Sequence, residues 1–288
     1  MAYPSAIASL TGLTFVAFDT ETTGLSPIGA HLVELSGVKF QTNGQVLSTF
    51  SQLIDPEDKI PQEATAIHGI TDDMVNGQPT YSTVIPSFFQ WIGQGDAVLL
   101  AHNAAFDLGF LEVALARLNT LPPDYLVLDT LSLSRKLLPE AVNHQLRTLV
   151  EHLELSSGGY HRALADSYHV KDLFIRLLGR LADIGTWKEL SDICAPMSFN
   201  NLQEEARAQL RTMPEGFESI TQAIDEGLPI SLIYQGGQVA KRIVTPQAVH
   251  GWRGRYYLSA YCHTVKAERT FRLDRIVSFQ LLEKSVAN

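Results

Sequence analysis

Cysteine is scarce in this sequence, with only Cys194 and Cys262 among 288 residues. The two lie in different predicted domains and lack the close spacing of a cysteine zinc site. Such sparse use of cysteine is typical of a reducing compartment, and we therefore expect a cytoplasmic protein.

Long apolar runs are also lacking, and none approaches the length needed to cross a bilayer. The first residues, MAYPSAIASLTGLTF, contain no basic segment, so no signal peptide is predicted there. We find no internal repeat and no low-complexity segment. The composition is close to that of ordinary globular proteins, with 45% hydrophobic and 18% charged residues, and the length allows two compact domains.

Positive charge is scarce through the first three quarters of the chain. Residues 1–216 carry a net charge of −12, whereas residues 217–288 carry +3. An acidic segment repels phosphate unless cations neutralise it, and a mildly basic segment tolerates anions. A charge difference that serves only solubility would look the same, so the pattern alone does not decide between these explanations.

The hydrophobic pattern of the first two thirds predicts a mixed sheet flanked by helices. Residues 14–18 are a short apolar run, typical of a buried strand, that ends at Asp19. Asn43-Gly44 joins two further strand-like runs and is a strong hairpin signal. A hairpin followed by alternating strands and helices indicates an α/β fold. Further strands are predicted at residues 97–101 and 125–129, and helices at residues 81–93, 104–118, 130–137, 145–153 and 163–181.

The pattern weakens after about residue 186 and then changes character. We predict a connecting helix over residues 200–210 and a boundary at Met213-Pro214-Glu215-Gly216. A short helix at residues 217–226 precedes closely spaced strands with turns at Gly236-Gly237 and Gly251–Gly254, which indicates a small barrel. The predicted organisation is a domain of residues 1–185, a helical linker of residues 186–216 and an all-β domain of residues 217–288.

Three acidic side chains follow predicted strands of the first domain. Asp19 and Glu21 lie at positions i and i+2 of a strand, so their carboxylates point to the same face. Two anions at the edge of an apolar sheet are unfavourable unless a cation binds or one is protonated. Asp107 follows the strand at residues 97–101, at the carboxyl edge where α/β sheets bind ligands. An acidic turn at Asp19 and a helix-dipole role for Asp107 are the structural alternatives.

His161 and Asp166 are five positions apart, which corresponds to about 140° around a helix. One helix face therefore does not carry both. We place His161 in the loop before a helix and Asp166 in its early turns, so that both reach one pocket. Carboxylates without cysteine favour Mg²⁺ or Mn²⁺ over zinc, and a histidine beside them suits a general base near neutral pH.

Together these motifs resemble the DEDDh exonuclease family, which includes polymerase proofreading subunits. The resemblance rests on Phe18-Asp19-Thr20-Glu21-Thr22-Thr23-Gly24-Leu25, on Asn103-x-x-Phe106-Asp107 and on His161-x-Ala163-x-x-Asp166. Connecting segments also match at Ile67–Thr71, Leu128–Leu131 and Asn143-His144. The resemblance covers about residues 12–182 and implies a ribonuclease-H-like sheet.

The resemblance also implies roles for these residues. Two divalent cations, Mg²⁺ or Mn²⁺, would be held by Asp19, Glu21, Asp107 and Asp166. His161 would be the general base of a 3′→5′ exonuclease that releases nucleoside 5′-monophosphates from DNA, with single-stranded 3′ ends as the expected substrate. The residues expected to bind the terminal nucleotide are Thr22, Thr23, Gly24, Leu25, Asn103 and Phe106. The structural alternatives are a core position for Phe106 and turn or core roles for the other histidines of these segments, His68, His102 and His144.

The last segment resembles the WYL domain, on Arg255-Tyr256-Tyr257-Leu258 and Phe271-Arg272-Leu273-Asp274-Arg275-Ile276. Tyr256 stands where the namesake tryptophan is expected. The resemblance implies a small Sm/SH3-like barrel that binds nucleic acid or a nucleotide and regulates the attached domain. Tyr257, Arg272 and Arg275 are the expected ligand contacts, because an aromatic face and guanidinium groups suit bases and phosphates. Strand alternation would place the two arginines on opposite faces, so either could be structural.

The leading hypothesis is a DNA-directed exonuclease with an accessory nucleic-acid-binding domain and no membrane partner. An RNA-directed exoribonuclease is the alternative, because ribose is distinguished by 2′-hydroxyl contacts that this sequence does not reveal. A ligand-sensing regulator on an exonuclease scaffold is disfavoured, since all five catalytic positions are filled and no helix-turn-helix precedes residue 217. A polymerase-bound proofreading subunit is less favoured, because a barrel replaces a flexible tail.

Overall fold

The computed structural model describes residues 3–25, 27, 29–93, 97–118, 120, 124–155, 161–181, 184–199, 215–236, 239–252 and 255–283. The chain divides into two compact units, which are described separately. The first comprises Met1–Thr23 and His31–Leu202, and the second comprises Gly24–Ala30 and Gln203–Asn288. Within the described ranges, no helix combines the length and the apolar character that a membrane span requires.

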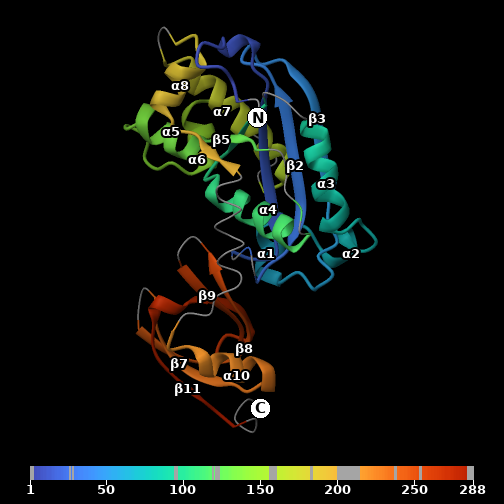
Figure 1. The fold of residues 1–288 in the computed structure, drawn as a ribbon, viewed down its shortest axis with the longest axis vertical. Helices are drawn as coiled ribbons and strands as arrows, with labels where there is room; N and C mark the ends of the chain where they lie inside the picture. Colours follow the sequence, from blue (N-terminus) through green and yellow to red (C-terminus); the bar gives the residue numbers. More distant parts are fainter. Residues whose placement is uncertain are drawn as a thin grey trace. The chain divides into compact units, whose positions relative to one another are not determined.

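A six-stranded mixed sheet forms the centre of the first unit (Figure 1). Its order is β3-β2-β1-β4-β5-β6, in which β1, β4 and β5 are parallel and the other pairings are antiparallel. This confirms the predicted mixed sheet. The strands are β1 (Phe15–Thr22), β2 (Leu32–Phe40), β3 (Val46–Leu53), β4 (Val98–Ala101), β5 (Leu126–Asp129) and β6 (Met197–Ser198).

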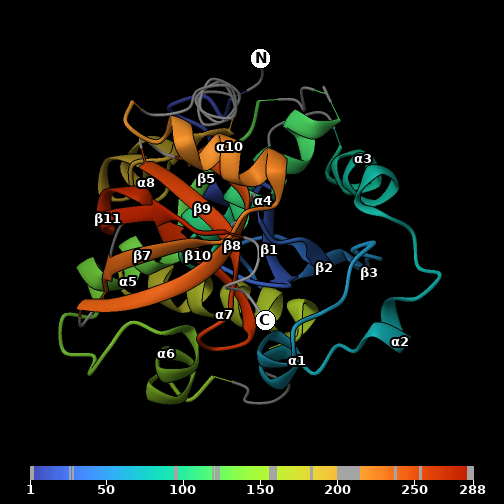
Figure 2. The same ribbon diagram turned by 90° about the horizontal axis from the view of Figure 1, so that it is seen from below.

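Helices cover both faces of this sheet, as predicted. On one side α7 (Ala163–Leu178) packs on β1 and β2, and on the other side lie α3 (Tyr81–Ile92) and α4 (Ala105–Arg117) (Figure 2). The remaining described helices of this unit are η1 (Leu10–Gly12), α1 (Gln62–His68), α2 (Asp72–Val75), α5 (Thr130–Leu137), α6 (Leu146–His152) and α8 (Trp187–Ile193). Helices α1 and α2 were not predicted, because seven and four residues are too few to establish a helical period.

Strand β1 sends alternate side chains to the two helical layers. The ring of Phe15 lies 5.0 Å from that of Phe174 in α7, whereas Phe18 lies 6.1 Å from Phe88 in α3. Since side chains alternate along a strand, Asp19 and Glu21 share the α7 face with Phe15. Packing of the apolar half of β1 therefore fixes the direction of its two carboxylates.

β1 is longer than the apolar run predicts. The run ends at Phe18, but Asp19, Thr20 and Glu21 remain paired with β2 in register. Hydrogen bonds between backbones do not require apolar side chains, so hydrophobicity underestimates the strand. Both carboxylates consequently project from a rigid strand.

Residues 186–199, assigned to a linker by sequence analysis, form structure within the first unit. Thr186 caps α8 through a reciprocal pair of hydrogen bonds with Glu189, and β6 pairs with β5 at the edge of the sheet. The helix predicted at residues 200–210 lies outside the described residues.

Among its described residues, the second unit contains the α-helix α10 (Glu218–Glu226), the 3-10 turn η2 (Leu273–Arg275) and an antiparallel sheet in the order β10-β9-β8-β7-β11. Ile220 and Ala223 of α10 join the hydrophobic core beneath the sheet with Leu232, Val244 and Leu258. The predicted helix and all-β segment are confirmed, whereas closure into a barrel stays a prediction. The strands are β7 (Ile230–Gln235), β8 (Val239–Trp252), β9 (Arg255–Cys262), β10 (Ala267–Arg272) and β11 (Ile276–Leu281).

Candidate active site

Three carboxylates meet between β1 and the first turn of α7. One oxygen from each of Asp19, Glu21 and Asp166 lies within 4.8 Å of the others. Strand alternation supplies the first two, and α7 packs across them and supplies the third. The structure thus brings together three of the four side chains that the sequence suggested as metal ligands.

The fourth, Asp107, lies outside this group of three but is hydrogen-bonded to β1, the strand that carries Asp19 and Glu21. It is 3% exposed, and its Oδ1 accepts hydrogen bonds from the backbone nitrogen and the Oγ1 of Thr20, at 3.0 and 2.8 Å. Thr20 lies between Asp19 and Glu21 in β1. Asp107 therefore reaches β1 from the α4 side of the sheet, opposite α7.

The turn before α4 is held by a residue that sequence analysis did not single out for a site role. Oδ1 of Asp129, at the end of β5, accepts hydrogen bonds from the backbone nitrogens of Asn103 and Ala104, at 2.9 and 3.2 Å. The same carboxylate caps α5. Asn103 has a left-handed backbone with φ 64°. Asp129 therefore fixes the turn that carries Asn103 and leads to Asp107.

His161 lies in the loop before α7, as the helical geometry required. Its side chain is exposed, and its backbone is left-handed with φ 63°. The backbone nitrogen of His161 donates to Oδ2 of Asp166 at 3.0 Å. The other oxygen of Asp166 lies 3.3 Å from Nδ1 of the buried His169. Asp166 therefore links the loop and the helix.

A fifth carboxylate, Glu34 of β2, lies beside the cluster and was missed by sequence analysis. It is 2% exposed and directly opposite Glu21 in the strand register. Its oxygens accept from Nη2 and Nε of Arg162, at 2.8 and 3.1 Å, and from the backbone nitrogen of Ala163 at 3.0 Å. The available signal was an acid inside the buried run LVELSGV, which requires a partner.

Three of the carboxyl groups, those of Asp19, Glu21 and Asp107, have raised pKa values. Burial, followed by the charges of Asp107 and Asp166, raises the pKa of Asp19 well above its usual range. Burial, Asp166 and Glu34 raise the pKa of Glu21 to about 8. Burial raises the pKa of Asp107 to about 7 against the opposing effect of hydrogen bonds from Thr20. The site is thus short of positive charge.

A divalent cation fits this donor set. The three clustered side chains offer oxygen ligands, which Mg²⁺ and Mn²⁺ prefer, and no sulfur. A cation would also relieve the repulsion that raises the pKa values of Asp19 and Glu21.

The loop after β1 combines anchored and exposed residues. Thr23 exchanges hydrogen bonds with His31: the nitrogen of Thr23 donates to the carbonyl of His31, and the nitrogen of His31 donates to Oγ1 of Thr23, both at 2.8 Å. Thr22 is buried at the end of β1. Leu25 is 85% exposed.

Phe106 and the other histidines have structural contacts. Phe106 is half-buried, with its ring 5.2 Å from that of Phe110. Both ring nitrogens of His102 are bonded, to Thr130 Oγ1 and to the carbonyl of His144. Nδ1 of His68 accepts from the nitrogen of Ile70, and Nδ1 of His144 lies 3.1 Å from Oγ of Ser134.

In the second unit, the suggested ligand residues differ in their surroundings. Arg272 forms a two-pronged ion pair with Asp274, at 3.0 and 2.5 Å. The alternation expected between Arg272 and Arg275 does not apply, because residues Leu273–Arg275 form the 3-10 turn η2. Arg275 is exposed, and Tyr257 pairs opposite Arg272 across β9 and β10.

A cavity of about 520 Å³ in the second unit contains none of these three residues. Arg242 and Arg269 line it together with the aromatic side chains Tyr234 and Phe271, whose rings lie 5.1 Å apart, edge to face. Arg242 could not be selected from the sequence, because both faces of its strand carry polar residues.

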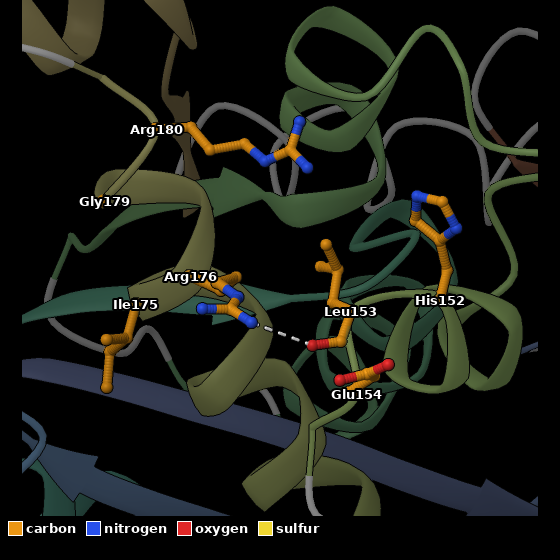
Figure 3. Close-up of a pocket in the computed structure, with 7 residues that line it drawn as sticks. All are labelled: His152, Leu153, Glu154, Ile175, Arg176, Gly179 and Arg180. Atoms are coloured by element: carbon orange, nitrogen blue, oxygen red, sulfur yellow. Dashed lines mark hydrogen bonds between the residues drawn. The ribbon is translucent and has the colours of Figure 1, made fainter.

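Another cavity, of about 600 Å³, lies at the far end of α7 (Figure 3). Its arginines are held by the protein itself, Arg176 by the carbonyl of Leu153 at 3.0 Å and Arg180 by Glu140 at 2.9 Å. Ile175 lies about 13 Å along the helix from Asp166. This cavity is therefore separate from the carboxylate cluster. It is lined by His152, Leu153, Glu154, Ile175, Arg176, Gly179 and Arg180.

Comparison with known proteins identifies both parts of the chain. Residues 16–174 match the family model RNase_T, described as exonuclease, and residues 215–281 match the WYL domain. The DNA polymerase III PolC-type protein of Oceanobacillus iheyensis is 38% identical over 228 residues, which are 79% of this chain and 15% of that protein. The chain thus spans only about a seventh of this relative.

Solved structures agree with this fold. Exonuclease X in complex with 5′ overhanging duplex DNA is 28% identical, with a TM-score of 0.50 over 63% of this chain and 98% of that one. Exonuclease I of E. coli, solved with a dA16 oligonucleotide, is 16% identical, with a TM-score of 0.54 over 86% of this chain and 55% of that one. The sheet of the first unit is accordingly ribonuclease-H-like.

Proposed function

Since the chain belongs to the exonuclease family (RNase_T) and carries a WYL domain, we propose that it is a 3′→5′ exonuclease acting on DNA. It removes nucleoside 5′-monophosphates from single-stranded 3′ ends with the help of two divalent cations, Mg²⁺ or Mn²⁺. The observation that carries the proposal is the convergence of Asp19, Glu21 and Asp166 beside Asp107.

The metal-holding residues are Asp19, Glu21, Asp107 and Asp166. When bound, the cations neutralise the carboxylates and offset charge on the phosphodiester group during displacement. Thr20 and the turn before α7 hold two of these ligands in place, through the hydrogen bonds to Asp107 and from the nitrogen of His161 to Asp166. The protein thus restrains these two side chains before substrate arrives.

His161 acts as the general base. Its side chain is exposed, and its backbone nitrogen donates a hydrogen bond to the carboxylate of Asp166, five positions along the chain. Its imidazole takes a proton from the attacking water, the water oxygen bonds to phosphorus, and the bond to the departing 3′ oxygen breaks. His68, His102 and His144 are less suited, because each has a ring nitrogen engaged by the fold.

The terminal nucleotide binds against Thr22 and Thr23, at the end of β1, and the turn with Asn103 and Phe106. The half-buried ring of Phe106 supports this proposal. DNA is favoured over RNA because Exonuclease X, which is 28% identical, was solved with duplex DNA. An RNA substrate remains the second candidate.

The WYL domain binds nucleic acid or a nucleotide and modulates the residence of the enzyme on a strand. Its positive charge supports this role, as does the cavity that joins Arg242 and Arg269 to an aromatic pair. Arg275 and Tyr257 are further contact candidates. Arg272 stabilises the turn through Asp274 and contributes less to ligand binding.

Degradation of matched single-stranded and duplex DNA and RNA tests the proposal. Labelling the 5′ or the 3′ end distinguishes direction, and EDTA followed by added Mg²⁺ or Mn²⁺ tests the metal requirement. We expect Asp19→Asn and Asp107→Asn to abolish nucleotide release. Asp192→Asn, which makes the same change in an exposed pair with Lys188, serves as the control. Full activity of either site variant would contradict the proposed site.

A further inference from the structure

Glu34 is a buried anion beside a group of carboxylates that already repel one another. At 2% exposure it lies directly opposite Glu21. A further negative charge at this position is costly unless it is paired and hydrogen-bonded. Arg162 is that partner and forms a bidentate ion pair, with its Nη2 and Nε at 2.8 and 3.1 Å from the carboxylate oxygens of Glu34.

The contacts of Glu34 are directed at the start of α7. Besides Arg162, which is the N-cap residue, Glu34 accepts from the backbone nitrogen of Ala163 at 3.0 Å. Two carboxylates therefore hold the same short segment. Asp166 accepts a hydrogen bond from the backbone nitrogen of His161, and Glu34 accepts one from the backbone nitrogen of Ala163. One anchor comes from α7 itself and the other from β2.

These two hydrogen bonds hold a backbone conformation that is unfavourable by itself. His161 has φ 63°, which a residue with a side chain adopts only at a cost. The hydrogen bonds donated by the backbone nitrogens of His161 and Ala163 support this turn. Without the anchor from β2, the segment would keep its bonds to Asp166, from the nitrogen of His161 and to the carbonyl of Arg162, but the side chain of His161 would sample more orientations.

We propose that Glu34 and Arg162 form a positioning pair that sets the orientation of His161 for proton transfer. The inference rests on the proposed function, in which His161 is the base. Glu34 is buried and lies outside the group formed by Asp19, Glu21 and Asp166, so we assign it a positioning role and no part in the chemistry. Its effect on the rate passes through the turn of residues 161–163.

A double-mutant cycle between Glu34→Gln and His161→Gly tests this proposal in the full chain. Glycine retains the left-handed backbone while removing the imidazole. We expect Glu34→Gln to lower kcat about 10- to 100-fold, with KM for a short oligonucleotide and Mn²⁺ affinity nearly unchanged. In the His161→Gly background, the same change should alter kcat by less than about twofold, because residues that act through one another are not additive.

Controls separate positioning from folding. Glu151→Gln makes the same substitution in an exposed pair with Arg147 and should leave kcat unchanged. The melting temperature and the fraction of enzyme molecules that are active are measured for every variant. If Glu34→Gln does not fold, Arg162→Ala removes the more exposed partner and must show the same loss of additivity with His161→Gly.

The outcomes distinguish the two proposals. If the fold-losses of kcat in Glu34→Gln and His161→Gly multiply in the double variant, the two residues act independently. That result would overturn the positioning role while leaving His161 as the base. A fall in activity that only follows the active fraction would overturn it as well. Full activity of His161→Gly would instead contradict the proposed base and, with it, the positioning inference.

Discussion

At the scale of single residues, the raised pKa values of the carboxylates predict how stability depends on pH. The pKa of Glu21 in the folded protein is about 8, above its usual value of 4.5. The folded state then binds more protons than the unfolded state between these values, so its stability falls as pH rises from about 4.5 to 8. We expect the melting temperature of the metal-free protein to fall over this range.

Comparison with Glu21→Gln isolates this contribution. His68 and His102, with lowered pKa values, act in the opposite direction, because their stabilising contribution is lost as pH falls. The difference between the melting temperatures of wild type and Glu21→Gln removes their effect. At pH 8 the variant should be the more stable in EDTA, and saturating Mg²⁺ should reverse the order. Parallel curves in EDTA would contradict the assigned shift.

The base assignment gives a second prediction at this scale. His161→Gly should lower the rate about 10²- to 10⁴-fold, the usual span for general acid–base catalysis. Because His161 is exposed, added imidazole can reach the vacated position and should restore part of the activity. His152→Gly, an exposed histidine at the far cavity, is the matched control. Equal activity of the two variants would contradict the assignment.

Some residues of the candidate site could be placed from the sequence, and others could not. The convergence of Asp19 and Glu21 follows from strand alternation, and the placement of His161 before a helix follows from angular spacing. Glu34 could not be assigned in this way, because its partner Arg162 lies 128 positions away and only folding brings them together. The unusual feature visible in the sequence was a charged residue inside an apolar strand.

At the scale of elements, β1 and α4 are linked by Thr20 and Asp107. Thr20→Val preserves shape and strand preference but removes the hydroxyl that donates at 2.8 Å. The backbone nitrogen of residue 20 still donates to the same oxygen, so Asp107 loses one of its two bonds to β1. We expect kcat to fall about tenfold, the equivalent of a hydrogen bond worth about 1.4 kcal/mol.

The measurement compares kcat and Mn²⁺ affinity of Thr20→Val with those of Thr49→Val, the same change on the exposed edge strand β3. Weaker Mn²⁺ binding in the first variant alone would support the role of the link in holding a ligand. Unchanged kcat in both variants would show that the backbone bond is sufficient.

Most long elements were predictable, but the short or polar ones were not. The helices α3, α4, α5 and α6 match their predicted ranges to within a residue or two, because apolar periodicity extends over whole turns. The polar end of β1 is a strand because β2 pairs with it, and β6 joins the sheet with only two residues. Such elements are determined by neighbours distant in sequence rather than by their own composition.

At the scale of the whole molecule, the parts of the chain before and after residue 216 differ in charge. Residues 1–216 carry −12 and residues 217–288 carry +3. Long nucleic acid is repelled by the first unit except where cations intervene, and the second unit offers arginines, two of them at one cavity. Under the proposed function, this distribution suits a division of roles, with chemistry before residue 216 and additional phosphate contacts after it.

A chain ending at Gly216 tests this division. It should retain metal-dependent cleavage of short oligonucleotides, since the carboxylate cluster lies wholly within the first unit. It should bind long single strands more weakly, and its affinity should fall less steeply with salt, because fewer phosphates are neutralised. If nucleic acid contacts the cavity, Arg242→Ala in the full chain should reproduce part of this loss of affinity. If nucleic acid contacts the exposed turn η2, Arg275→Ala should do so instead. The melting temperature of each variant must also be measured, because a variant that unfolds the sheet would also lose binding. Equal affinities and equal salt slopes for the full and shortened chains would contradict nucleic-acid binding by the WYL domain and favour a protein ligand for it instead.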